Sequence, residues 1–148
     1  RESASFAPGQ DWRVVASPFG GLGLSICYDV RFPELYRQLR AAGASVLLVP
    51  AAFTHVTGEA HWLPLLRARA IENQCYVVAA NQCGQHGAGR RTWGHSVIID
   101  PWGQVLAEAQ ENVGLIQAEL NPQFLKQIRH DMPVLNHARL RSGWREPE

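Results

Sequence analysis

The feature that most constrains the fold is a series of short apolar runs that alternate with segments of helical periodicity. The runs Leu22–Cys27, Val46–Val49 and Tyr76–Ala80 contain no charged residue, and such runs are typical of buried strands. The sequence predicts one helix between the first two runs and a second, from about His61 to Gln74, between the last two. Strands that alternate with helices in this way are typical of an α/β sheet with helical crossovers.

Local signals support the first of these helices. Pro33 suits the first helical position, Glu34 favours the positive end of the helix dipole, and Gly43 is a good stop. A further helix is predicted to begin after Asn121, which is a good N-cap, with Pro122 as its first residue, and to reach about His130.

The second half of the chain has a different pattern. Ser96–Ile99 and Gln104–Ala109, joined by the turn Asp100-Pro101-Trp102-Gly103, predict a hairpin. Val113–Leu120 predicts one more strand. The tail from Pro133 onward has no apolar period, and we expect it to pack on a partner or a neighbouring subunit.

Composition excludes several classes of partner. The chain has 148 residues, of which 46% are hydrophobic and 18% charged, and its formal net charge is +1. This near-neutral balance gives no electrostatic reason to expect nucleic acid or an anionic membrane as a partner, and no apolar run is long enough to span a bilayer. Three cysteines without CxxC spacing, and no basic-then-apolar leader, lead us to expect a cytoplasmic protein with reduced thiols.

Cys27 lies at a position that favours a catalytic residue in such a fold. It ends a predicted buried strand and lies shortly before a predicted helix, so a tight turn exposes its thiol at the edge of the sheet, near backbone N–H groups. This is the arrangement of a nucleophile elbow, without the GxSxG sequence. The alternative is a buried structural cysteine. The polar residues Asp29, Arg31 and Glu34 nearby make an inert apolar pocket the weaker interpretation.

Several motifs, in order along the chain, resemble the nitrilase superfamily of carbon–nitrogen hydrolases. They lie in the segments 26–35 (ICYDVRFPEL), 50–54 (PAAFT), 66–73 (LRARAIEN), 80–84 (ANQCG), 94–96 (GHS) and 100–103 (DPWG). The resemblance covers the chain from Arg1 to about Arg139. Two further segments, 1–9 with its Arg-Glu-Ser start and 54–58 (THVTG), most resemble the branch that includes the deaminated glutathione amidases and the ω-amidases.

The resemblance implies an α-β-β-α sandwich whose active site uses a glutamate base, a lysine and a cysteine, often with a second glutamate. Cys27 matches the nucleophile, which attacks an amide carbonyl, releases ammonia and forms a thioester that water hydrolyses. Glu2 matches the second, positioning glutamate. The backbone N–H of Tyr28 would be one donor to the oxyanion. No cofactor is implied.

The resemblance also implies that residues 1–148 are the C-terminal half of such a domain. In the family the base and the lysine lie upstream of the Arg-Glu-Ser segment, and the only lysine here, Lys126, is expected to be a solvated helix residue. We therefore expect the N-terminal half as a partner that brings the base and the lysine, and a homo-oligomer as the final assembly. The rival interpretation is a non-catalytic partial domain that acts as a structural partner chain.

Three residues are candidates for binding a small amide that carries a carboxylate. Arg31 can clamp a carboxylate through its two-pronged guanidinium, although an ion pair with Asp29 or Glu34 is an equal alternative. Phe53 and Thr57 match positions that line the substrate pocket in this branch, as an apolar wall and a hydroxyl donor. Deaminated glutathione is the first expected substrate, with ω-amidase, N-carbamoyl hydrolase and nitrilase activities as alternatives.

The remaining polar residues have more ordinary interpretations. Arg67, Arg69 and Glu72 can reach one another at helical spacing and are predicted to be structural. The histidines and cysteines lack the paired spacing of a zinc site, so we expect no metal. His95 could form a Cys–His dyad with Cys27, a minor alternative. Glu59 follows the expected pocket loop and could support the catalytic groups, but we expect a solvated carboxylate. Cys75 is predicted to lie in the core, and Cys83 could border the site without taking part.

Overall fold

The computed structural model describes residues 5–140 of the chain. Along that part it has the following helices and strands: β1 Val14–Ser17, β2 Gly20–Leu24, the 3₁₀ helix η2 Cys27–Arg31, α1 Pro33–Ala41, β3 Ala44–Leu48, α2 His55–Asn73, β4 Tyr76–Ala79, β5 Cys83–His86, the 3₁₀ turn η3 Gly87–Gly89, β6 Arg90–Trp93, β7 Val97–Ile99, β8 Val105–Glu108, α3 Pro122–Asp131 and α4 Val134–His137.

A six-stranded sheet in the order β1-β2-β3-β4-β7-β8 forms the framework. Its centre is parallel, β2 with β3 and β3 with β4, and the helices α1 and α2 are the crossovers between these strands. The strands β1, β7 and β8 pair antiparallel at the two sides. The predicted α/β sheet with helical crossovers and the predicted hairpin of β7 and β8 are therefore confirmed.

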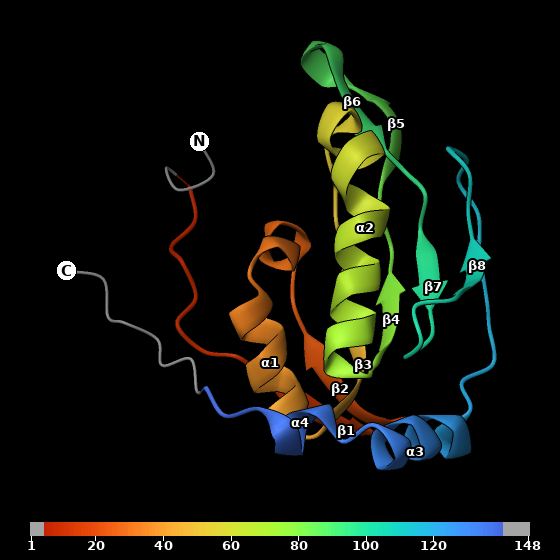
Figure 1. The fold of residues 1–148 in the computed structure, drawn as a ribbon. Helices are drawn as coiled ribbons and strands as arrows, with labels where there is room; N and C mark the ends of the chain where they lie inside the picture. The colour runs from red at the N-terminus through yellow and green to blue at the C-terminus, as the bar shows by residue number, and fades with distance from the viewer. Residues whose placement is uncertain (1–4, 141–148) are drawn as a thin grey trace.

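The two faces of the sheet are covered by different elements (Figure 1). The helices α1 and α2 lie along one face, where a core that includes Leu39, Leu47, Trp62 and Leu66 is fully buried. The opposite face carries a smaller cluster, in which Leu125 of α3 packs with strand residues that include Val46 and Tyr76. Because successive strand residues point to opposite faces, the same strands supply both clusters.

The local helix signals predicted the helix termini well. Pro33 is the first residue of α1, which ends at Ala41, two residues before Gly43. Asn121 caps α3, and its side-chain oxygen accepts hydrogen bonds from the backbone N–H groups of Gln123 and Phe124 at 3.0 Å each.

Two predicted element bounds and one predicted strand were wrong. The first strand ends at Leu24, not at Cys27, because Cys27 has a positive φ of 47° that no strand allows. The helix α2 begins at His55, one turn and more before the predicted His61. Residues 113–120 form no strand, since they have no paired strand in the described part of the chain, and Val113 and Leu115 are 96% and 90% exposed.

Several elements had no counterpart in the sequence prediction. One is β1, which pairs with β2. The β5–β6 hairpin, which closes through Gly87-Ala88-Gly89 and stands apart from the main sheet, is another. The glycines of that turn were its visible signal. Of the predicted tail, residues 133–140 are described and contain the short helix α4, while residues 141–148 lie outside the described part.

Candidate active site

The candidate site lies at the carboxyl ends of the three parallel strands. Cys27 follows β2, Phe53 follows β3 and Asn81 follows β4. The carboxyl ends of parallel strands meet at one edge of a sheet, the usual place for a site in an α/β fold. The predicted residues Cys27 and Phe53 are thus brought to the same edge, although they are 26 positions apart.

Cys27 occupies a strained turn that is held by its neighbours. Its φ of 47° is in the left-handed region, which costs roughly 1–3 kcal/mol for a residue other than glycine and persists only where the surroundings enforce it. The backbone N–H of Cys27 donates to Pro50 O at 2.9 Å, and the N–H of Ile26 donates to Asp29 Oδ2 at 2.8 Å. The thiol is half-buried. This is the strand-to-helix elbow that the sequence suggested, with Cys27 three residues after the end of the strand.

The other cysteines have different surroundings. Cys75 is fully buried, its Sγ lies 3.3 Å from Ala44 O, and burial raises the pKa of its thiol. It is the core residue that the sequence predicted. Cys83 is half-buried in β5. Cys27 is thus the cysteine that combines partial exposure with a backbone φ in the left-handed region.

Tyr28 follows the nucleophile candidate in the first turn of η2. Backbone N–H groups in the first turn of a helix have no acceptor within the helix, which makes them suitable donors to a developing anion. The Tyr28 side chain is 63% exposed, and its ring lies edge-on to Phe32 with centroids 5.7 Å apart.

Arg31 has no carboxylate partner among residues 5–140. Asp29 instead accepts a hydrogen bond from the Ile26 N–H. Within residues 5–140 no ion pair joins Arg31 to Asp29 or to Glu34, which was the alternative interpretation. The guanidinium instead lies 5.1 Å from the centre of the Phe53 ring, and its Nη1 lies 3.3 Å from Nδ1 of His61 on α2.

Phe53 is buried beneath Arg31. It is 4% exposed, and its ring packs against Trp62 with centroids 5.0 Å apart. The Phe53 N–H donates to the side-chain oxygen of Asn81 at 2.9 Å, and Asn81 Nδ2 donates to Gly94 O at 2.6 Å. Asn81 therefore ties the loop after β3 to the segment before β7. Asn81 belongs to the motif of residues 80–84, but the sequence predicted no role for it.

Thr57 lies on a helix and not in a loop. It is in the first turn of α2, and its hydroxyl lies 2.6 Å from that of Thr54. Glu59 belongs to the same helix and is exposed, as predicted. A loop was expected at 54–58 because its glycine and β-branched residues are weak helix formers. In the structure Gly58 packs directly against Trp93, and a Cβ at this position would collide with the Trp93 side chain.

His95 has partners of its own. Its ring stacks on Trp93 with centroids 4.3 Å apart, and its Nδ1 lies 3.0 Å from Glu108 Oε1. The hydrogen bonds of residues 5–140 include none between His95 and Cys27.

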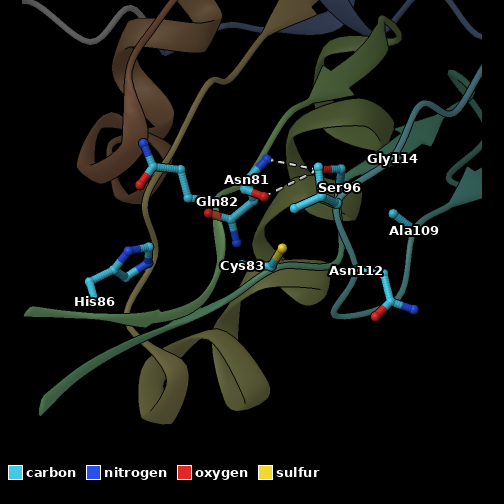
Figure 2. Close-up of a pocket in the computed structure, with 9 residues that line it drawn as sticks. Asn81, Gln82, Cys83, His86, Ser96, Ala109, Asn112 and Gly114 are labelled. Atoms are coloured by element: carbon cyan, nitrogen blue, oxygen red, sulfur yellow. Dashed lines mark hydrogen bonds between the residues drawn. The ribbon is translucent and has the colours of Figure 1, made fainter.

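A pocket of about 280 Å³ lies beside this edge of the sheet (Figure 2). It is lined by residues that include Asn81, Cys83, Ser96 and Asn112, and the Ser96 hydroxyl is hydrogen-bonded to both backbone groups of Asn81. Cys27 does not line it. Cys83 lines this pocket, and its position beside the turn that carries Cys27 stays a prediction.

No group of three or more metal-ligating side chains lies within residues 5–140. None of the helices described has both the length and the apolar character that crossing a membrane requires. Glu2, the predicted positioning glutamate, lies outside the described residues.

Known proteins share both the sequence and the fold of this chain. The family model described as carbon–nitrogen hydrolase matches residues 1–130. A deaminated glutathione amidase of Synechocystis is 59% identical over 138 residues, which cover 92% of this chain and 51% of that protein. The chain thus spans about half the length of the curated relatives it matches.

The solved structures extend the similarity to three dimensions. The C. elegans NitFhit protein is 52% identical with a TM-score of 0.88, over 91% of this chain and 33% of that one. An amidase from Nesterenkonia, with a covalent adduct at its active-site cysteine, is 39% identical with a TM-score of 0.70, over 76% of this chain and 43% of that one. The described fold therefore matches part of a nitrilase-type structure, as the sequence predicted.

Proposed function

The chain belongs to the carbon–nitrogen hydrolase family, and we propose that Cys27 is the nucleophile of an amidase that releases ammonia from small amides bearing a carboxylate. The observation that carries this proposal is the turn at Cys27. A half-buried thiol stands at the carboxyl edge of the parallel strands, on a residue with a φ of 47° whose N–H is fixed by Pro50. Strained backbone of this kind concentrates at functional sites.

The proposed reaction has two halves. The Cys27 sulfur attacks the amide carbonyl carbon after its proton passes to the base, and the carbonyl oxygen becomes an oxyanion that the Tyr28 N–H stabilises. The intermediate collapses, the C–N bond breaks, and the amide nitrogen leaves as ammonia with the proton returned by the base. Water then attacks the thioester, which yields a carboxylate and the free thiol.

The remaining chemical groups are proposed to come from outside the described residues. In the family the glutamate base and the lysine lie upstream of the segment that this chain represents. Glu2 would position them. The relatives' names support the amide class of substrate, and deaminated glutathione is the substrate we propose first.

Arg31 is proposed to hold the substrate carboxylate. Its guanidinium has no carboxylate partner among residues 5–140 and is held above Phe53 by the ring and by His61. Phe53 would then act on the substrate site indirectly, by supporting the Arg31 guanidinium, because only 4% of its own surface is exposed. The Thr57 hydroxyl, which lies beside that of Thr54, would need to turn toward the substrate to donate a hydrogen bond.

The test of this function is a pair of cysteine variants in the complete enzyme. Cys27→Ala should abolish ammonia release from a carboxylate-bearing amide, while Cys83→Ala, which removes another half-buried thiol, should leave it close to wild type. Iodoacetamide should label Cys27 before Cys83 and Cys75, since Cys75 is fully buried. Substantial turnover in Cys27→Ala would end the assignment.

A further inference from the structure

The turn that carries Cys27 is fixed on its upstream side by a buried hydroxyl pair. Ser25 is 6% exposed, and its Oγ donates to Leu48 O at 2.9 Å. The hydroxyl of Tyr36 on α1 lies 2.8 Å from the same Oγ. Because a serine hydroxyl has one hydrogen, which here goes to Leu48, Tyr36 is the donor in the second bond. Tyr36 itself is fully buried.

On the downstream side, the turn is fixed by an arginine from α2. Arg69 is 5% exposed, and its Nε donates to Val30 O at 2.9 Å. Val30 lies in η2, three residues after Cys27, and is fully buried. A buried carbonyl at the end of a short helix needs a donor from elsewhere in the fold, and Arg69 supplies it from a residue 39 positions away.

The two anchors meet at Tyr36. The guanidinium carbon of Arg69 lies 5.6 Å from the centre of the Tyr36 ring, while the hydroxyl of that ring holds Ser25. Glu72, one turn further along α2, balances the buried charge, with Oε1 2.7 Å from Arg69 Nη1. A buried guanidinium is costly unless it is paired and hydrogen-bonded. The contacts that restrain the segment 25–30, on which Cys27 lies, are those of Tyr36 with Ser25 and of Arg69 with Val30.

We propose that Arg69 is a positioning residue for the nucleophile: together with Tyr36 it holds Cys27 in its left-handed conformation, with the thiol aimed at the substrate. The inference rests on the proposed role of Cys27. The helical spacing of Arg67, Arg69 and Glu72 predicted only a structural group, and the contact of Arg69 with Val30 is what adds the positioning role. A guanidinium suits this position because its separate N–H groups can donate to Val30 and to Glu72 at once, whereas the ammonium group of a lysine is a single point charge.

The experiment compares two arginines of the same helix in the complete enzyme. Arg67 also donates its Nε to a backbone carbonyl at 2.9 Å, but that carbonyl belongs to Gly103 in the β7–β8 turn. Arg67→Lys is therefore the matched control for Arg69→Lys. Arg69→Lys should lower kcat about tenfold to a hundredfold with KM changed less than threefold, since a small misplacement of a reacting group is enough for such a loss. Arg67→Lys should leave kcat within about twofold of wild type.

A second readout separates positioning from stability. The rate of Cys27 alkylation by iodoacetamide should fall with kcat in Arg69→Lys and not in Arg67→Lys, with both variants measured well below their Tm. Tyr36→Phe, which keeps the ring but removes the hydrogen bond to Ser25, should lower kcat at least threefold. If Arg69→Lys fails to fold, Tyr36→Phe tests the positioning proposal in its place.

The outcomes that contradict the proposal are distinct from those that contradict the function. If Cys27→Ala is inactive while Arg69→Lys, or Tyr36→Phe in its place, keeps wild-type kcat and alkylation rate, Arg69 is structural and only the inference fails. If Cys27→Ala remains active, the proposed function fails and the inference falls with it.

Discussion

The two faces of the six-stranded sheet differ in how far this chain covers them. On the face under α1 and α2, Leu47, Val77 and Ile99 are fully buried. On the opposite face, α3 covers only part of the sheet, and Leu24 and Leu106 remain 41% and 37% exposed. The same strands supply both sets of side chains, so the difference lies in what packs on them and not in the strands.

This difference shows which parts of the site the chain determines by itself. The turn at Cys27 is held from the covered face, through Tyr36 of α1 and Arg69 of α2. On the less covered face, exposed apolar side chains are the kind of surface that a partner covers. We propose that the other half of the family's domain packs there and brings the base and the lysine, so that one face positions the nucleophile and the other completes the chemistry.

The largest expected effect is on activity. The isolated 148-residue chain should release ammonia at less than about 10⁻² of the rate of the complete enzyme, because the loss of a single oxyanion-type donor already costs about 10² to 10³ in rate. The measurement is ammonia release by chain of verified mass, with and without the upstream half of the domain added. Robust release by the chain alone would contradict the division between the faces and favour a Cys27–His95 dyad.

The next effect is on stability, and it compares one leucine from each face. Leu47→Ala should lower the free energy of unfolding by about 2–5 kcal/mol, the usual cost of a cavity in a packed core. Leu106→Ala in the isolated chain should cost less than about 1 kcal/mol, since its side chain is 37% exposed. Urea denaturation of the two variants, monitored by circular dichroism, measures both values. Equal losses would mean that the second face is as well packed as the first.

A smaller effect depends on pH. Burial raises the pKa of Tyr36 to about 12, whereas an unfolded chain ionises this group near pH 10. The protonated phenol therefore contributes stability that is complete below about pH 10 and is lost as the pH rises toward 12, by roughly 2–3 kcal/mol. Denaturant midpoints measured from pH 9 to 12 should fall, and Tyr36→Phe should flatten that fall. Burial also raises the pKa of Tyr76 on the opposite face, so Tyr76→Phe is the matched control, with a smaller flattening expected.

The smallest effect concerns Arg31, at the edge where the proposed substrate enters. Arg31→Lys in the complete enzyme keeps the charge but removes the fork, so kcat/KM for a carboxylate-bearing amide should fall about tenfold while the fold survives. The same variant should hydrolyse a neutral amide at the wild-type rate. A loss of stability with unchanged substrate constants would instead make Arg31 a structural residue.

Much of the fold could be predicted because its signals are local. Asn121 and Pro122 begin α3, Pro33 begins α1, and the DPWG turn closes the β7–β8 hairpin. Each of these features depends on residues within a few positions of one another. The family could be recognised in the same way, from short motifs in order along the chain, and the match over residues 1–130 agrees with it.

The tertiary structure decided what depends on distant residues. The sequence placed Cys27 in a strand, but Pro50, Tyr36 and Arg69 hold it in a left-handed turn beyond the strand's end. Arg31 faces His61 on α2 and not the acids next to it in sequence.

The segment 113–120 has the apolar pattern of a strand and forms none in the described chain, since a strand needs a neighbour to satisfy its backbone groups. Capping and periodicity are properties of a few successive residues and can be read from the sequence. The conformation of the cysteine turn, the partner of a guanidinium and the pairing of a strand depend on which distant segments the sheet and its helices bring together.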